Sequence, residues 1–220
     1  MTMTIDDENS EEQGYTSISE LLWNWPLFDN LFLSMQGQNV MLVDFYLRDL
    51  ELDLLREYME RERTPVQSAM FVSALSQMWI FAVYELLRMW RQMVRELSGT
   101  PTASSGKVTS LTNIAEKVRE HHREQFANDA AFRSELESAS KLIDPVFKRI
   151  DALRVNLAKH EVKGIKGSIA PAPGYGRIDM TDGSIYWMVD LGDNHVDIVS
   201  RRAIADELRA RVIKSPKHPS

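Results

Sequence analysis

Apolar residues in the first half of this chain recur at the three- and four-residue spacing of a helix. Between about Val40 and Arg63 a mostly apolar row alternates with acids and arginines, which predicts an amphipathic helix. The row consists of Leu42, Phe45, Tyr46, Asp49, Leu52, Leu55 and Met59. Thr64 and Pro65 break the pattern, and a second helix is predicted from there to about Leu97. Helices joined so tightly are expected to run antiparallel.

The middle of the chain continues the helical pattern after a connection. Small polar residues from 98 to 110 predict a flexible link. Helical periodicity then covers about 111–126 and 129–163, with an interruption at Asp144 and Pro145. Because Asp caps helices and Pro suits their first turn, the last of these helices is predicted to begin at Pro145.

Beyond residue 163 the pattern changes from helical to alternating. Glycines and prolines fill the loop 164–176, and residues 177–200 alternate as strands do, with hairpin turns at Asp182–Gly183 and at 192–194. Ser200 is placed to cap a final helix to about Ile213. A sheet this small is weak alone, so it is expected to pack on the helices.

These elements predict a mostly α protein, a helical bundle with a small C-terminal antiparallel β-meander and a terminal helix. The expected organisation is an acidic disordered tail (1–16), the bundle (17–163), a linker loop (164–176), the meander with its helix (177–213) and a tail (214–220).

An aromatic segment opens the bundle. Ser17 and Glu20 form a capping box for a short helix that Pro26 should end. The aromatic side chains that follow are Trp23, Trp25, Phe28 and Phe32. They are expected to form an arm over the core, with a partner-binding patch as the alternative.

Composition narrows the class of protein. The 220 residues include no cysteine, which excludes disulfides, thiolate zinc sites and cysteine nucleophiles and fits a reducing cytoplasm. The acidic N-terminus lacks an apolar signal core. Residues 64–84 carry no charge over a length that could span a membrane, but their scattered Gln and Ser side chains favour a buried helix. No membrane partner and no cofactor are expected.

Charge is unevenly distributed. The net charge is −6, yet residues 148–220 carry 13 Lys and Arg against 9 Asp and Glu, so an anionic partner is expected at this end unless the asymmetry is chance. Arg201 and Arg202 follow the Ser200 cap, where the helix dipole disfavours cations. They are expected to meet an acidic partner or, more simply, to point to water.

The remaining histidines carry weaker signals. His121 and His122 lie beside Glu120 and Glu124 and could bind a metal, but no third ligand is evident and a solvated surface is favoured. His195 is expected in an exposed turn.

The sequence RVNLAKHE, residues 154–161, contains the residues most suited to chemistry. Arg154 interrupts an apolar line of one helix, and an Arg there needs a carboxylate or phosphate. Asn156 and His160 share a neighbouring face. Arginine holds phosphates and histidine moves protons near neutral pH, the two functions that phosphodiester cleavage requires. Alternatively, Arg154 pairs with an acid such as Glu85 and His160 caps the helix.

A helical bundle whose late helix carries Arg154, Asn156 and His160 before a loop resembles the HEPN (higher eukaryotes and prokaryotes nucleotide-binding) superfamily over about residues 40–163. The resemblance implies a metal-independent endoribonuclease or RNA-binding protein of a bacterial defence or stress system, acting as a homodimer that brings two motifs together. It also implies that Arg154 clamps phosphate, His160 transfers a proton and Asn156 orients either one. The superfamily's polar residue usually follows the Arg directly, where this chain has Val155.

The second hypothesis is a noncatalytic helical module that binds a partner protein. The segments expected to bind the partner are the aromatic arm and a methionine-rich second helix with Met70, Met78, Met89 and Met93.

Overall fold

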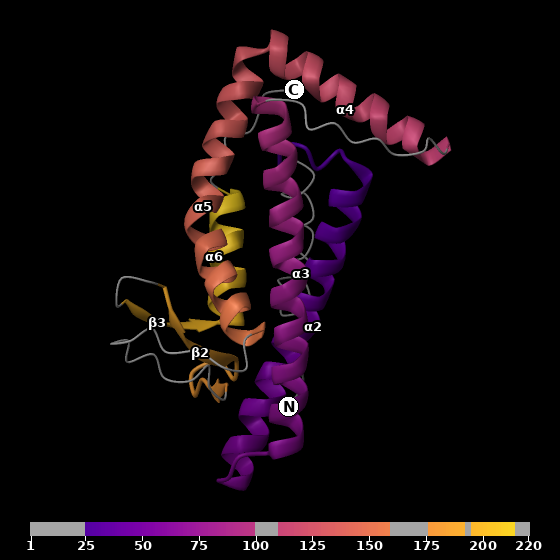
Figure 1. The fold of residues 1–220 in the computed structure, drawn as a ribbon. Helices are drawn as coiled ribbons and strands as arrows, with labels where there is room; N and C mark the ends of the chain where they lie inside the picture. The colour runs from indigo at the N-terminus through magenta and orange to yellow at the C-terminus, as the bar shows by residue number, and fades with distance from the viewer. Residues whose placement is uncertain (1–24, 100–109, 159–175, 192–194, 214–220) are drawn as a thin grey trace. The chain divides into compact units, whose positions relative to one another are not determined.

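The structure is a computed structural model that describes residues 25–99, 110–158, 176–191 and 195–213. Within them lie the helices α2 (Leu31–Arg61), α3 (Val66–Ser98), α4 (Ser110–Asn128), α5 (Ala130–Ala158) and α6 (Arg201–Ile213) and the strands β1 (Arg177–Ile178), β2 (Ile185–Asp190) and β3 (Val196–Ser200) (Figure 1). The predicted mostly α class is therefore confirmed. The expected tails, the short helix capped by Ser17 and nearly all of the two long loops fall outside the described residues.

The chain divides into two compact units, the first made of three segments and the second of two. The first unit comprises Met1–Met41, Arg88–Leu142 and Arg209–Ser220. The second unit comprises Leu42–Leu87 and Ile143–Leu208, and it holds the sheet, most of α2 and most of α6.

The core of the first unit is organised around Trp90 of α3, which is fully buried. Its indole ring lies 6.1 Å from the ring of Trp25, and its Nε1 donates a hydrogen bond of 2.9 Å to the carbonyl oxygen of Pro26. Phe28 is also buried, whereas Phe32 is 55% exposed. The prediction of an arm packed on the core is thus confirmed for Trp25 and Phe28 and is wrong for Phe32.

The buried face of α2 is not the apolar row that the sequence pattern indicates. Val40, Leu47 and Leu54, spaced by seven, are buried, and so are the acids Asp44 and Glu51 between them. The apolar row itself is mainly exposed, at Leu42, Phe45, Tyr46, Leu52 and Met59. The pattern misleads because α2 has apolar residues on both faces, while its inner face also contains acids.

Helix α5 is continuous from Ala130 to Ala158, so the predicted helix start at Pro145 is wrong. Proline removes one backbone hydrogen bond, but the buried side chains of Ile143 and Val146 on either side belong to one apolar face, and their burial keeps the helix intact. The predicted break before α5 does occur: Asp129 Oδ1 accepts hydrogen bonds from the backbone N–H groups of Ala131 (2.8 Å) and Phe132 (3.2 Å).

The sheet has the predicted antiparallel meander order β1-β2-β3. Its first turn contains Gly183 at φ 75°, and a Cβ there would lie 1.9 Å from the backbone oxygen of Glu51, so the turn packs directly on α2. Ser200 caps α6 as predicted, because its Oγ accepts a hydrogen bond of 3.0 Å from the N–H of Ala203.

Candidate functional site

Arg154 lies near the end of the described part of α5. Its guanidinium carbon is 4.2 Å from the centroid of the Tyr84 ring on α3, and its Nη2 lies 3.0 Å from Oδ1 of Asp151 on its own helix. The side chain is 29% exposed. Arg154 is therefore held by an aromatic ring and a carboxylate while remaining open to solvent. The alternative partner Glu85 is replaced by Asp151 in the contact that the structure shows.

In the described part of α5, the amide of Asn156 bonds within its own helix and not to Arg154. Asn156 uses its amide nitrogen to donate a 2.7 Å hydrogen bond to the carbonyl oxygen of Ala152, one turn back in α5. His160 lies outside the described residues. Of the two predicted site residues that the structure describes, Arg154 presents a charged group to solvent and Asn156 bonds its own helix.

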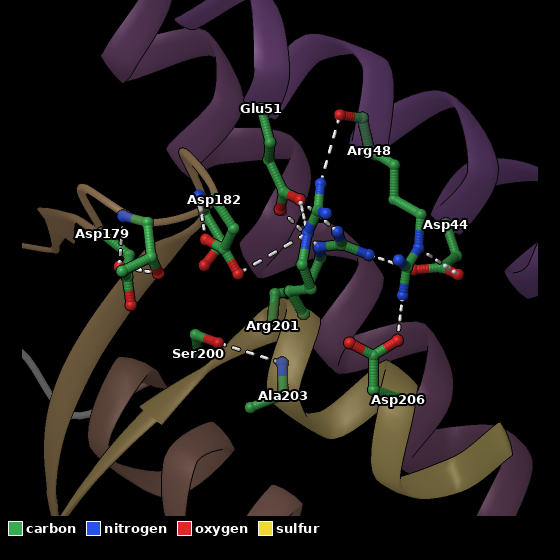
Figure 2. A network of polar contacts seen from close by, with 12 residues as sticks. Asp44, Arg48, Glu51, Asp179, Asp182, Ser200, Arg201, Ala203 and Asp206 are labelled. Atoms are coloured by element: carbon green, nitrogen blue, oxygen red, sulfur yellow. Dashed lines mark hydrogen bonds and ion pairs between the residues drawn. The ribbon is translucent and has the colours of Figure 1, made fainter. Parts of the chain in front are cut away.

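The most extensive polar cluster is buried between α2 and α6, around Arg201 (Figure 2). Arg201 is 0% exposed; its Nε and Nη2 donate to the two carboxylate oxygens of Glu51 at 2.8 and 2.6 Å, and its Nη1 bonds Asp44. The guanidinium carbon also lies 5.4 Å from the ring centroid of Trp79 on α3. This bidentate pairing satisfies a charge that would otherwise be very costly to bury.

Three neighbours complete the cluster. Arg202 Nε lies 2.9 Å from Oε2 of Glu51, and Arg48 bonds Asp206 of α6. The prediction that Arg201 and Arg202 point to water is therefore wrong, and the acidic partner that a basic helix start requires is α2 of the same chain. The signal in the sequence was the seven-residue spacing of Asp44 and Glu51 in a row with buried leucines.

A second polar pair, between a buried histidine and an exposed carboxylate, lies in the first unit. His122 is 2% exposed, and its Nε2 lies 2.9 and 2.8 Å from the two carboxylate oxygens of Asp29. The hydrogen bond from His122 holds the pKa of Asp29 below its ordinary value of 3.8. A solvated surface was thus the wrong interpretation of His122, whereas His121 and His195 are exposed.

Among the described residues no group of three or more His, Asp or Glu side chains could hold a metal ion. The described part of the chain does include one helix, α3, that is long and apolar enough to cross a membrane, and 39% of its most apolar window is buried.

The second unit leaves two rows of apolar side chains open to solvent. We call the first the outer α2 face; it comprises Leu42, Phe45, Tyr46 and Leu52, exposed by 38 to 57%. The outer α3 face comprises Val66, Met70, Phe71, Ala74, Met78 and Phe81, and its large side chains are exposed by 37 to 69%. Soluble monomers rarely leave so many large apolar side chains uncovered on adjacent turns.

The elements described here define a mostly α protein with a small antiparallel sheet and no recognisable catalytic cluster among the residues that the structure describes. Neither a protein-family model, nor a curated protein, nor a solved structure matches the chain.

Proposed function

We propose that this chain is a helical protein-interaction module that binds protein through the outer α2 and α3 faces. The observation that carries the proposal is the inverted burial of α2: acids occupy its inner face, while Leu42, Phe45 and Tyr46 face solvent. Burying an apolar side chain of this size stabilises by roughly 1.5–3 kcal/mol. Leaving several of them exposed is therefore expected only where another molecule covers them.

The charged residues around the outer α2 face favour a protein over a lipid surface as its partner. The exposed charged residues Asp49, Asp53 and Arg56 lie beside the outer α2 face, within three turns of the helix. A helix face in hydrocarbon excludes such charges, whereas a protein interface combines an apolar centre with a polar rim.

The absence of cysteine from the chain allows a direct experiment. A photo-crosslinker attached at Tyr46→Cys or Met78→Cys should form covalent adducts with protein in a cell extract, because both side chains are more than half exposed within the apolar faces. The matched control is Lys141→Cys on α5, which is exposed by 74% beside Glu137 and lies outside both faces. Equal adduct formation at residues 46, 78 and 141, or adducts with lipid alone, would contradict the proposal.

A second candidate function is suggested by Arg154. Its guanidinium is oriented by Tyr84 and Asp151 yet remains 29% exposed, as a phosphate clamp would be, and the chain continues from α5 to His160. The corresponding proposal is a HEPN-like metal-independent endoribonuclease, with His160 as the proton-transfer residue.

This second candidate is tested by RNA cleavage in the presence of a metal chelator. The native chain should cleave, His160→Ala should lose activity by about 100-fold or more, and Lys141→Ala should behave as the native chain. If all three preparations cleave equally or not at all, the ribonuclease proposal fails and the interaction proposal is unaffected.

A further inference from the structure

The outer α3 face has an arrangement that suits pairing with a copy of itself. Val66, Met70, Ala74 and Met78 follow one another at intervals of four residues, so they form one ridge along the helix. Ala74 is the midpoint between Met70 and Met78 and is exposed like them. A small central residue lets a second helix approach closely, and the larger side chains on either side then meet across the contact.

The charges at the two ends of the ridge define the orientation of such a pair. No charged residue occurs between Arg63 and Glu85, and both of these residues are exposed. Ala74 lies eleven residues from each of them. Arg63 lies in the turn before α3, three residues ahead of Val66, so in an antiparallel pair centred on Ala74 it comes to the same end of the contact as Glu85 of the other copy. A parallel pair would place like charges together instead.

The exposed apolar area of the outer α3 face is more than half of what each partner of a standard interface buries. The five large side chains of the outer α3 face are 37 to 69% exposed, and together they expose on the order of 500 Å² of apolar surface, against the ~800 Å² that each partner of a standard interface buries. The flanking Gln67, Ala82, Arg63 and Glu85 are exposed too and would enlarge the contact.

We infer that the outer α3 face binds a second copy of this chain, with the two α3 helices nearly antiparallel and crossing at Ala74. Met70 of one copy packs on Met78 of the other, and Arg63 pairs with Glu85 at both ends of the contact. This inference rests on the proposed interaction function and assigns one of its two faces to the chain itself, which leaves the outer α2 face for a different protein.

The test is a charge exchange read by molar mass in solution. The native chain should be dimeric at micromolar concentration. Arg63→Glu and Glu85→Arg should each weaken the dimer by roughly tenfold, since each places like charges at both ends of the contact. The double variant Arg63→Glu/Glu85→Arg should recover it. Met180→Asp, at a 43% exposed position in the sheet turn, is the control and should remain dimeric.

Several outcomes would overturn the inference. A monomeric native chain, a dimer unaffected by either charge reversal, or a double variant as weak as the singles each contradict antiparallel pairing at Ala74. Flotation of the native chain with phospholipid vesicles, lost in Met78→Asp, would make lipid the occupant. If the chain is monomeric but a crosslinker at residue 78 still captures another protein, the self-pairing fails and the interaction function stands. If it captures nothing, both fail.

Discussion

At the scale of single residues, two arginines with several partners each differ in their exposure to solvent. Arg201 is sealed against Glu51 and Asp44, whereas Arg154 is held by Tyr84 and Asp151 but open to solvent. The sequence identified Arg154 as unusual but favoured a solvent-exposed position for Arg201, because a helix N-terminus gives no sign of which distant acids will face it. The acids were visible only as interruptions of a leucine row.

The buried pairing of Arg201 predicts a large effect on stability. Arg201→Met removes the fully buried guanidinium that pairs with both Asp44 and Glu51 and leaves them only the outer contacts with Arg48 and Arg202, so the free energy of unfolding should fall by about 3–5 kcal/mol. Arg56→Met removes a 71% exposed partner of Asp53 and should cost less than about 1 kcal/mol. Urea denaturation measures both.

A control covers the case in which the single variant does not fold. Arg201→Met combined with Glu51→Leu removes opposite charges together and should recover part of the lost stability. Equal costs for Arg201→Met and Arg56→Met would show that the cluster contributes little.

At the scale of elements, the sequence predicted where helices occur and how α6 is capped. It did not predict which face of α2 is buried or that α5 continues through Pro145. The break at Thr64–Pro65, the break before α5, the Ser200 cap and the meander were all predicted from local signals. The inner face of α2 depended on acids that pair with α6, and the passage of α5 through Pro145 depended on a shared core face. Both are tertiary effects that local pattern does not contain.

The contact between His122 of α4 and Asp29, in the turn before α2, predicts that stability depends on pH. The pKa of Asp29 is lowered by His122, so the pair contributes stability above pH ~3.8 that is lost as the pH falls through and below this value. The stability difference between the native chain and Asp29→Asn should therefore be constant near pH 5–6 and shrink towards pH 3.

A double-mutant cycle provides the control for this prediction. His122→Leu removes the same pair, so adding Asp29→Asn to it should change stability little and with little dependence on pH. The stability difference between the native chain and Asp29→Asn should not grow as the solution is acidified. Such growth would contradict a lowered pKa of Asp29 in the folded chain.

At the scale of the whole molecule, the proposed α3 pairing and the ribonuclease candidate require different dimers. In an antiparallel pair centred on Ala74, the two copies of Tyr84 lie at opposite ends of the contact, about 30 Å apart at 1.5 Å per residue. Each Tyr84 holds Arg154 of its own chain. This interface therefore does not bring the two copies of Arg154 together, and RNA cleavage that required both at one phosphate would need a different dimer.

The most direct measurement of the central claim is oxidative crosslinking of Ala74→Cys. The chain contains no other cysteine, so any disulfide-linked species joins two copies at residue 74. If α3 pairs with itself at its midpoint, the variant should form a covalent dimer in high yield at micromolar concentration, while Lys141→Cys under the same conditions should not. A monomeric Ala74→Cys whose thiol reacts with a maleimide as fast as that of Lys141→Cys would contradict it.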